Sequence, residues 1–175
     1  MSTDKLTLPT NQQWGSFRKN LLKVLGNLTI RHFRKSFELQ RFNDYDSEPW
    51  QEVKRRETGE NGTFKYRVKG GTQYKKKEGF KKGSKAARTN PILIGKGSGN
   101  LAKSFAMTQI TDTDVKVETI GIAENYAAVH NEGLKAGRGN GFQMPKREFA
   151  GDGDLLDREI TNEIEKYVQT FFDKF

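Results

Sequence analysis

VKVETIG at Val115–Gly121 and YAAVHNEG at Tyr126–Gly133 are the stretches that decide the fold of this chain of 175 residues. Apolar and charged residues alternate from Val115 to Glu118, and a period of two is typical of a half-buried strand. The second stretch has the pattern Tyr-Ala-x-x-His-x-x-Gly, which is not a catalytic signature. We expect a third strand or a short helix that ends at His130. The glycine-rich Glu132–Pro145 is then expected to be a mobile loop.

A partner for the first strand lies directly upstream. Met107–Ile110 is separated from Val115–Ile120 by Thr111–Asp114, whose short polar residues favour a turn. These two segments are expected to pair as antiparallel strands. Ser98 or Asn100 is expected to cap a short helix that precedes them.

A long helix is predicted near the N-terminus. Thr10 and Gln13 form the reciprocal capping pattern that begins a helix. Gly15 and Gly26 each cost a helix about 1 kcal/mol relative to alanine, so packing has to hold it. Its apolar residues recur at steps of three and four in two rows, which indicates two packing partners, at least one within its own domain. The first row is Trp14, Phe17, Leu21, Leu25, Leu28 and His32, and the second is Ile30, Phe33 and Phe37.

A second amphipathic helix is predicted at the C-terminal end, beginning behind Asp152 or Asp154. Trp50, after the turn-rich Asp44–Pro49, is expected to anchor the returning chain on the first helix. Helix, then strands, then helix is an α+β plan, with an antiparallel sheet packed by a long N-terminal helix and a C-terminal helix. The apolar row of the C-terminal helix is Leu156, Ile160, Ile164, Tyr167 or Val168, Phe171 and Phe175.

Composition favours one domain over residues 1–175. The hydrophobic fraction is 33% and the charged fraction 30%, so part of the chain is expected to remain exposed as a loop, an arm or an unfilled interface. There is no cysteine, which removes disulfides, thiolate metal sites and cysteine nucleophiles. No apolar run reaches the ~20 residues of a membrane span, and the start lacks the features of a signal peptide. We therefore expect synthesis in the cytoplasm and no membrane partner.

The positive charge is concentrated in an insertion at about residues 54–90. From Lys54 to Arg88 there are 13 basic and 3 acidic residues, a net of +10, whereas the rest of the chain has 18 basic and 19 acidic residues, a net of −1. Phe64, Tyr66 and Val68 alternate with cations inside Thr63–Lys69, which predicts a strand with an aromatic and a cationic face.

The insertion is predicted to be a projecting basic β-hairpin followed by a flexible loop. Gly70-Gly71 suits a two-residue turn, and Thr72–Lys77 is the expected return strand. A cationic block of this kind favours a polyanionic partner, although a solvated loop accounts for it equally well. The residues expected to meet nucleic acid or an acidic protein are Lys65, Arg67, Lys69, Lys75, Lys76, Lys77, Lys81, Lys82, Lys85 and Arg88.

No motif in the sequence points to catalysis, a cofactor or a metal. Gly95–Gly99 lacks the first glycine of a phosphate-binding loop, because Asn90 stands in its place. Asp152–Glu163 lacks an oxygen ligand and the sharp-turn glycine of a calcium loop. The two histidines, His32 and His130, lie on different predicted elements, so His130 is expected to fix a turn by hydrogen bonding. We expect no enzyme. The helical spacing of the aromatic residues favours a core or a subunit interface over a platform for bases.

An ordered series of short motifs runs along the chain. It begins with Trp50, continues with GNLAKSF at Gly99–Phe105 and the two opening stretches, and ends with REFAG at Arg147–Gly151. The series resembles the phage virion morphogenesis family, the tail-completion proteins of Mu-like phages, from Trp14 to Phe175, with no counterpart for residues 54–90. The resemblance marks as scaffold Trp50, Gly99, Leu101, Ser104, Tyr126, Ala127, His130, Gly133, Arg147 and Phe149.

This resemblance implies a structural virion protein of the head–tail junction, acting as a neck ring, tail-completion protein or tail terminator. It implies a homo-oligomeric ring, a hexamer or dodecamer, which contacts neighbouring connector or tail proteins. The basic insertion would then meet DNA in the lumen or an acidic neighbour. A stand-alone basic nucleic-acid-binding protein is the alternative, since it accounts for the basic block without the motif series.

Overall fold

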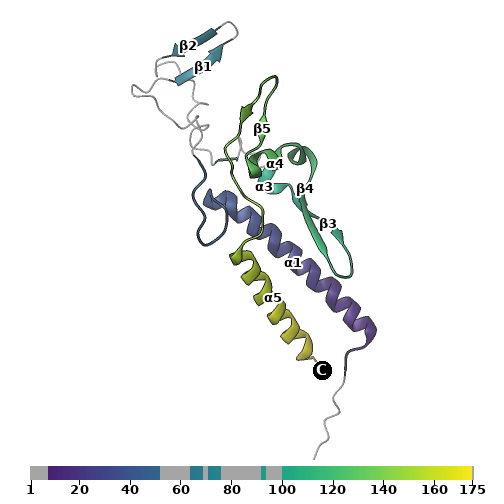
Figure 1. Cartoon of the computed structure of the whole chain (residues 1–175). Helices are drawn as coiled ribbons and strands as arrows, with labels where there is room; N and C mark the ends of the chain where they lie inside the picture. The colour runs from purple at the N-terminus through teal and green to yellow at the C-terminus, as the bar shows by residue number, and fades with distance from the viewer. Residues whose placement is uncertain (1–7, 52–63, 69–70, 76–91, 94–99, 175) are drawn as a thin grey trace, which may run out of the picture.

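The structure is a computed structural model that describes residues 8–51, 64–68, 71–75, 92–93 and 100–174, with only the backbone described for 64–68 and 71–75. It has the α+β class that the sequence predicts, and its longest helix lies between a second helix and a strand hairpin (Figure 1). In chain order the elements are α1 (Asn11–Leu39), β1 (Phe64–Val68), β2 (Gly71–Lys75), α3 (Asn100–Lys103), β3 (Phe105–Ile110), β4 (Val115–Thr119), the 3-10 turn η2 (Gly121–Ala123), α4 (Glu124–Glu132), β5 (Lys135–Ala136), β6 (Phe142–Gln143) and α5 (Asp154–Phe172).

The predicted capping arrangement begins α1. Gln13 N donates to Thr10 Oγ1 at 3.3 Å, and Thr10 N donates to Gln13 Oε1 at 2.7 Å. The helix ends at Gln40, whose left-handed backbone (φ 57°) turns the chain back. Trp50 N then donates to Gln40 O at 2.8 Å, so the return of the chain to α1 is fixed by a backbone bond as well as by the indole.

The second apolar row of α1 builds the core. Phe37 is 1% exposed, and the rings of Trp50, Phe105 and Phe149 surround it at centroid distances of 5.6, 6.3 and 5.0 Å. Burying a side chain of this size contributes roughly 1.5–3 kcal/mol. The remaining buried members of this core are Ile30, Ile92, Leu101, Ala123 and Ala127.

The first apolar row of α1 faces α5. The Phe17 ring lies 4.4 Å from Phe171 and 5.3 Å from Tyr167, and His32 Nδ1 lies 2.9 Å from Glu159 Oε2. Figure 1 shows α5 running beside α1. Both rows of α1 therefore have partners within the described chain.

The strands form three separate two-stranded antiparallel sheets among the described residues. The predicted pairing of β3 with β4 is confirmed, and its register runs from Phe105 opposite Thr119 to Ile110 opposite Val115. The helix α1 contacts this hairpin, while α5 packs on α1, so α1 lies between the other two layers. No single sheet covered by both helices is present in the part of the chain described.

Two expectations about the segment after β4 need correction. The segment expected to be either a third strand or a short helix is the helix α4, which continues past His130 to Glu132. The expected mobile loop contains the paired strands β5 and β6. Its glycines allow this, because Gly133, Gly137, Gly139 and Gly141 all have φ between 60° and 98°, a region that other residues rarely adopt.

The basic insertion contains the predicted strand pair. β1 and β2 are antiparallel, with Phe64 opposite Lys75 and Val68 opposite Gly71. Gly71 therefore opens β2 instead of standing in the turn, and the two connecting residues, 69 and 70, lie outside the described residues. That this hairpin projects from the domain stays a prediction.

Gly26→Ala is expected to lower the free energy of unfolding, although alanine is the better helix former. A Cβ at position 26 meets Met107 Sδ at 2.5 Å and Val115 Cγ2 at 2.9 Å, where α1 crosses the β3–β4 hairpin. Overpacking of this kind costs ~1–3 kcal/mol. Denaturant unfolding measures the change.

Gly15→Ala is the matched control on the same helix. No atom lies within 4 Å of a Cβ at position 15, so this variant is expected to gain up to ~1 kcal/mol of stability. Equal stability of the two variants would contradict the close crossing at Gly26.

Candidate assembly surfaces

Hydrogen bonds from side chains to backbone carbonyl groups hold the segment after β6 against the core. Trp50 Nε1 donates to Glu148 O at 2.8 Å, and Arg147 donates to Gln51 O from Nε at 3.4 Å and from Nη2 at 3.2 Å. Arg147 is 4% exposed. These side chains satisfy carbonyl groups at loops near the core, where an unpaired backbone oxygen is costly.

Asn131 makes three hydrogen bonds to the backbone of the same segment. Its Oδ1 accepts from Phe149 N at 2.9 Å and from Ala150 N at 3.1 Å, while its Nδ2 donates to Ala150 O at 2.9 Å. Sequence reasoning missed this residue, because its partners lie 18 and 19 positions further along the chain. Its place inside the Tyr126–Gly133 pattern was the one available signal.

The structure brings most of the expected scaffold residues together around the core. Ser104 Oγ donates to Leu101 O at 2.7 Å at the end of α3. Gly133 ends α4 in the left-handed conformation, and a Cβ there would lie 2.8 Å from Lys146 N. Gly99 lies outside the described residues. Those buried are Trp50, Leu101, Ser104, Ala127, Gly133, Arg147 and Phe149, and Tyr126 and His130 are half-buried.

His130 does not fix its turn in the way the sequence suggested. The bond at this point is between backbone groups, from Arg147 N to His130 O at 2.8 Å. In the described structure the buried Nδ1 atom has no hydrogen-bond partner, and the ring lies edge-on to Tyr126. Burial lowers the pKa of His130, and the Arg147 charge lowers it further.

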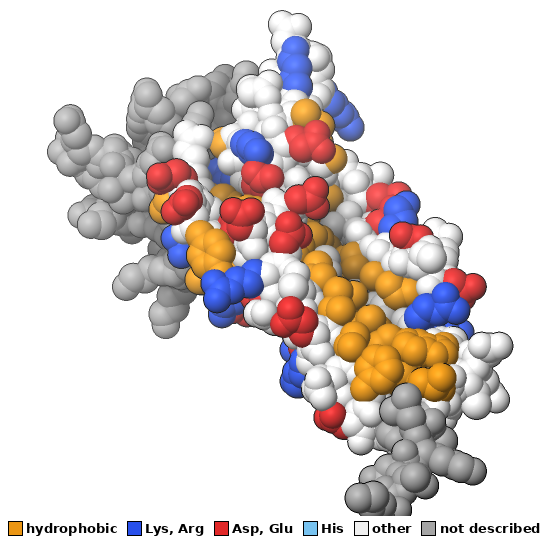
Figure 2. Space-filling view, turned by 60° about the horizontal axis from the view of Figure 1, so that its bottom comes forward, with side chains coloured by type: hydrophobic (Ala, Val, Ile, Leu, Met, Phe, Trp, Pro, Cys, Tyr) orange, Lys and Arg blue, Asp and Glu red, His pale blue; other side chains and the backbone are white. Residues whose placement is uncertain are grey.

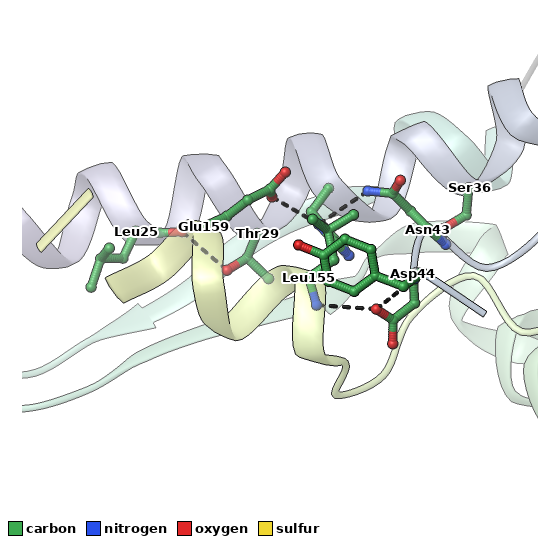
Figure 3. A network of polar contacts seen from close by, with 9 residues as sticks. Leu25, Thr29, Ser36, Asn43, Asp44, Leu155 and Glu159 are labelled. Atoms are coloured by element: carbon green, nitrogen blue, oxygen red, sulfur yellow. Dashed lines mark hydrogen bonds and ion pairs between the residues drawn. The ribbon is translucent and has the colours of Figure 1, made fainter. Parts of the chain in front are cut away.

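A polar network joins α5 to α1 and to the turn that follows it (Figure 3). His32 is fully buried at its side chain, and its Nδ1 lies 2.9 Å from Glu159 Oε2 and 3.1 Å from Asn43 Nδ2. A carboxylate only accepts hydrogen bonds, so the His32 tautomer that donates from Nδ1 suits Glu159, and in that tautomer Nδ1 does not accept from Asn43 Nδ2. The Asn43 backbone in turn donates to Ser36 Oγ at 3.1 Å.

Asp44 supplies the cap of α5, although the sequence places Asp152 and Asp154 at the start of this helix. The position before the helix is Gly153, which has no side chain, and Asp44 Oδ1 accepts from Leu155 N at 3.0 Å. A Cβ at Gly153 would lie 2.6 Å from Asp44 Oδ2, so the glycine leaves room for the cap. The sequence pattern did not reveal it, because cap and helix are 111 residues apart.

Five aromatic side chains gather where α1 begins and α5 ends. Trp14 contacts Phe171 and Phe172 at centroid distances of 5.2 and 5.8 Å, and Phe17 contacts Tyr167 and Phe171. Phe172 is 46% exposed. Figure 2, which brings the lower end of Figure 1 forward, shows hydrophobic side chains collected at this end and continuing up the molecule as a stripe. We name Trp14, Phe17, Tyr167, Phe171 and Phe172 the aromatic end.

All ten of the expected polyanion contacts lie outside the described side chains. Lys65 and Arg67 stand on β1 and Lys75 on β2, where only the backbone is described. The others lie outside the described residues altogether: Lys69, Lys76, Lys77, Lys81, Lys82, Lys85 and Arg88. Their contact with nucleic acid or an acidic protein stays a prediction.

The profile of the phage virion morphogenesis family matches residues 9–169, which covers most of the chain. The chain belongs to this family. Membership gives the protein a structural role in phage virion assembly and confirms the resemblance carried by the motif series. No curated protein and no solved structure gives a significant match.

In the part of the chain that the structure describes, no helix is long and apolar enough to cross a membrane. Within the same residues, no group of three His, Asp or Glu side chains is arranged to hold a metal ion.

Asp44→Ala is expected to destabilise the protein near neutral pH by ~1 kcal/mol through loss of the α5 cap. Burial raises the pKa of Asp44, but the backbone amides of Leu155, Tyr45 and Asp154 outweigh it, so the net pKa is lowered. A carboxylate whose pKa is lowered by folding stabilises the fold at pH values above its unfolded pKa of ~3.9. This stabilisation is lost as the pH falls through the folded pKa. Unfolding free energies of parent and variant should therefore converge below about pH 4.

The matched control is Asp46→Ala, which removes an exposed carboxylate from the same turn. It is expected to leave stability near neutral pH almost unchanged. A constant difference between parent and Asp44→Ala across the acid range would argue against a charged cap.

Proposed function

We propose that the protein forms a homo-oligomeric ring at the head–tail junction of the phage particle, as a neck, tail-completion or tail-terminator protein. It acts there in particle assembly and not in catalysis, and it joins head to tail through contacts with neighbouring connector or tail proteins. Family membership supports the virion role, and the exposed aromatic end is the observation that carries the step to a ring.

The aromatic end has the composition of a subunit interface. Aromatic residues are enriched at the centres of protein interfaces, and apolar patches on a protein surface mark contact sites. Trp14 and Phe172 lie near the ends of two packed helices, where Trp14 is half-buried and Phe172 is 46% exposed. In a ring each subunit uses one face against a different face of the next, so this end requires a second, complementary surface.

A stand-alone nucleic-acid-binding protein is the second candidate, and the basic insertion favours it. A net of +10 over residues 54–88 (13 basic minus 3 acidic) suits phosphate contacts in either setting. In a ring the insertion would line the lumen and meet DNA, or it would bind an acidic neighbour. Mass in solution and particle imaging separate the two candidates, because only the first requires a closed oligomer.

Phe172→Ser is expected to weaken ring formation while leaving the fold intact. If the ring contact buries this side chain, its loss costs ~1.5–3 kcal/mol, which is about a tenfold to hundredfold weaker association. Light scattering across a concentration series measures the shift, and circular dichroism checks the fold. Phe142→Ser removes a phenylalanine from β6 that is 59% exposed, more than Phe172, and is the control. A parent chain that stays monomeric at every concentration would refute the ring.

Replacing Lys75, Lys76 and Lys77 together with Glu is expected to flatten the salt dependence of DNA binding. Phosphate contacts release counterions, so the logarithm of the binding constant falls linearly with that of salt, by ~0.9 per contact. Fluorescence anisotropy with duplex DNA between low and moderate salt gives both slopes. If DNA binding is absent at low salt, or if the salt slope is unchanged, the partner of these cations is an acidic protein instead of DNA.

A further inference from the structure

We propose that the outer edge of β4 receives the basic β1–β2 hairpin of a second copy by strand addition. This proposal rests on the proposed ring and names one of its two contacting faces. It starts from an unfilled place in the sheet, because β4 pairs with β3 and with no other strand that the structure describes.

The backbone of β4 is suited to a further strand. Ile120 N donates to Ser104 O at 3.0 Å, so the backbone N–H of Ile120 points to the β3 side. In an antiparallel pair such residues alternate, which directs the backbone groups of Val117 and Thr119 to the outer edge. Unpaired strand edges are templates for pairing with another chain.

A groove of about 400 Å³ lies between the β3–β4 hairpin and α4. Val117 to Thr119 of β4 and the next residue, Ile120, line it, as do Phe105 and Thr108 of β3. The rings of Phe33 and Phe149 also lie among its lining. Ile120 is 49% exposed and Ile122, just beyond, is 77% exposed. The groove is therefore apolar in its lining and has uncovered apolar residues beside it.

The charged residues that line the groove are both acidic. Glu118 lies on β4 and Glu124 in the first turn of α4. Lys116 Nζ lies 2.7 Å from Glu118 Oε1 and offsets part of that charge, whereas Glu124 is exposed. An occupant that combines apolar and cationic side chains in alternation fits this lining.

The strand β1 has that composition. Phe64, Tyr66 and Val68 alternate with Lys65 and Arg67, and alternate residues of a strand share a face. An added strand would continue both faces of β4. The aromatic and β-branched residues would extend the face of Val117 and Thr119, and the cations would stand beside Glu118, where opposite charges on neighbouring strands contribute favourably.

A second copy is the occupant that the ring requires. Each subunit has one hairpin to give and one groove to fill, so a head-to-tail contact repeats around a ring until it closes. Residues 52–63, between Gln51 and β1, can span up to ~40 Å when extended, so chain length does not confine the hairpin to its own groove. Insertion of the hairpin into the groove of the same chain is the competing outcome.

Engineered disulfides test the proposal directly, because the chain has no cysteine of its own. One population carries Thr119→Cys and another carries Tyr66→Cys, and the two are mixed and oxidised. Neighbouring Cβ atoms about 3.8 Å apart form a disulfide readily. We expect a covalent dimer that contains one chain of each kind, and oxidation of a population that carries both cysteines should give ladders of linked subunits.

Thr161→Cys, exposed on α5, replaces Thr119→Cys in the control mixture and is expected to give no enriched dimer. To allow for register, Phe64→Cys and Val68→Cys are tested against Thr119→Cys in the same way. If rings form but none of these cross-links appears, the strand-addition inference is overturned and the proposed ring is not. Monomers without cross-links overturn both, and a disulfide confined to single chains shows that the hairpin fills its own groove, which also overturns it.

A charge exchange provides the second measurement. Glu118→Lys combined with Glu124→Lys is expected to weaken association at least tenfold, and so is Lys65→Glu combined with Arg67→Glu. Mixing the two variants should restore association, because each contact then joins opposite charges again. Losses that persist in the mixture would mean that these residues do not face one another.

Discussion

The packing of α1 against two unlike partners is the constraint on which the rest of the structure depends. Phe37 lies among Trp50, Phe105 and Phe149, so one face of the helix gathers three segments that are far apart in the chain. Each of these rings would lose its contacts if α1 were displaced. The opposite row of the same helix carries α5, and the two faces therefore couple the C-terminal helix to the core.

Polar side chains determine how the loops meet this core. Asn131 holds the backbone of Phe149 and Ala150, Trp50 binds Glu148 O, and Arg147 binds Gln51 O. Each contact satisfies a backbone group next to buried aromatic rings, where an unpaired group would cost ~1–3 kcal/mol. Trp50 and Arg147, two residues of the motif series, are therefore placed where chain segments cross.

Two described surfaces and the sequence of the insertion differ in chemistry in a way that suits assembly. The aromatic end is apolar and partly exposed, the β4 groove is apolar with two acidic residues, and the insertion is strongly basic. Unlike surfaces on one subunit permit head-to-tail contacts, whereas a single self-complementary patch would give a closed dimer. Family membership and this division of surfaces together motivate the ring at the head–tail junction.

The sequence by itself determined the elements that depend on local pattern. The capping pair Thr10 and Gln13, the two apolar rows of α1 and the β3–β4 pairing all follow from spacing, because period and caps act over a few residues. The same holds for the family, since an ordered series of short motifs is a property of the sequence.

Only the tertiary structure decided which distant groups meet. Asp44 caps α5 across 111 residues, and Asn131 binds the backbone of residues 149–150. Gly26 leaves room for the side chains of Met107 and Val115. None of these contacts can be predicted from the periodicity of the sequence. The arrangement of layers was decided in the same way. Whether α5 covers a sheet or α1 depends on which apolar surfaces fit together, and a pattern of apolar residues gives the face of a helix without its partner.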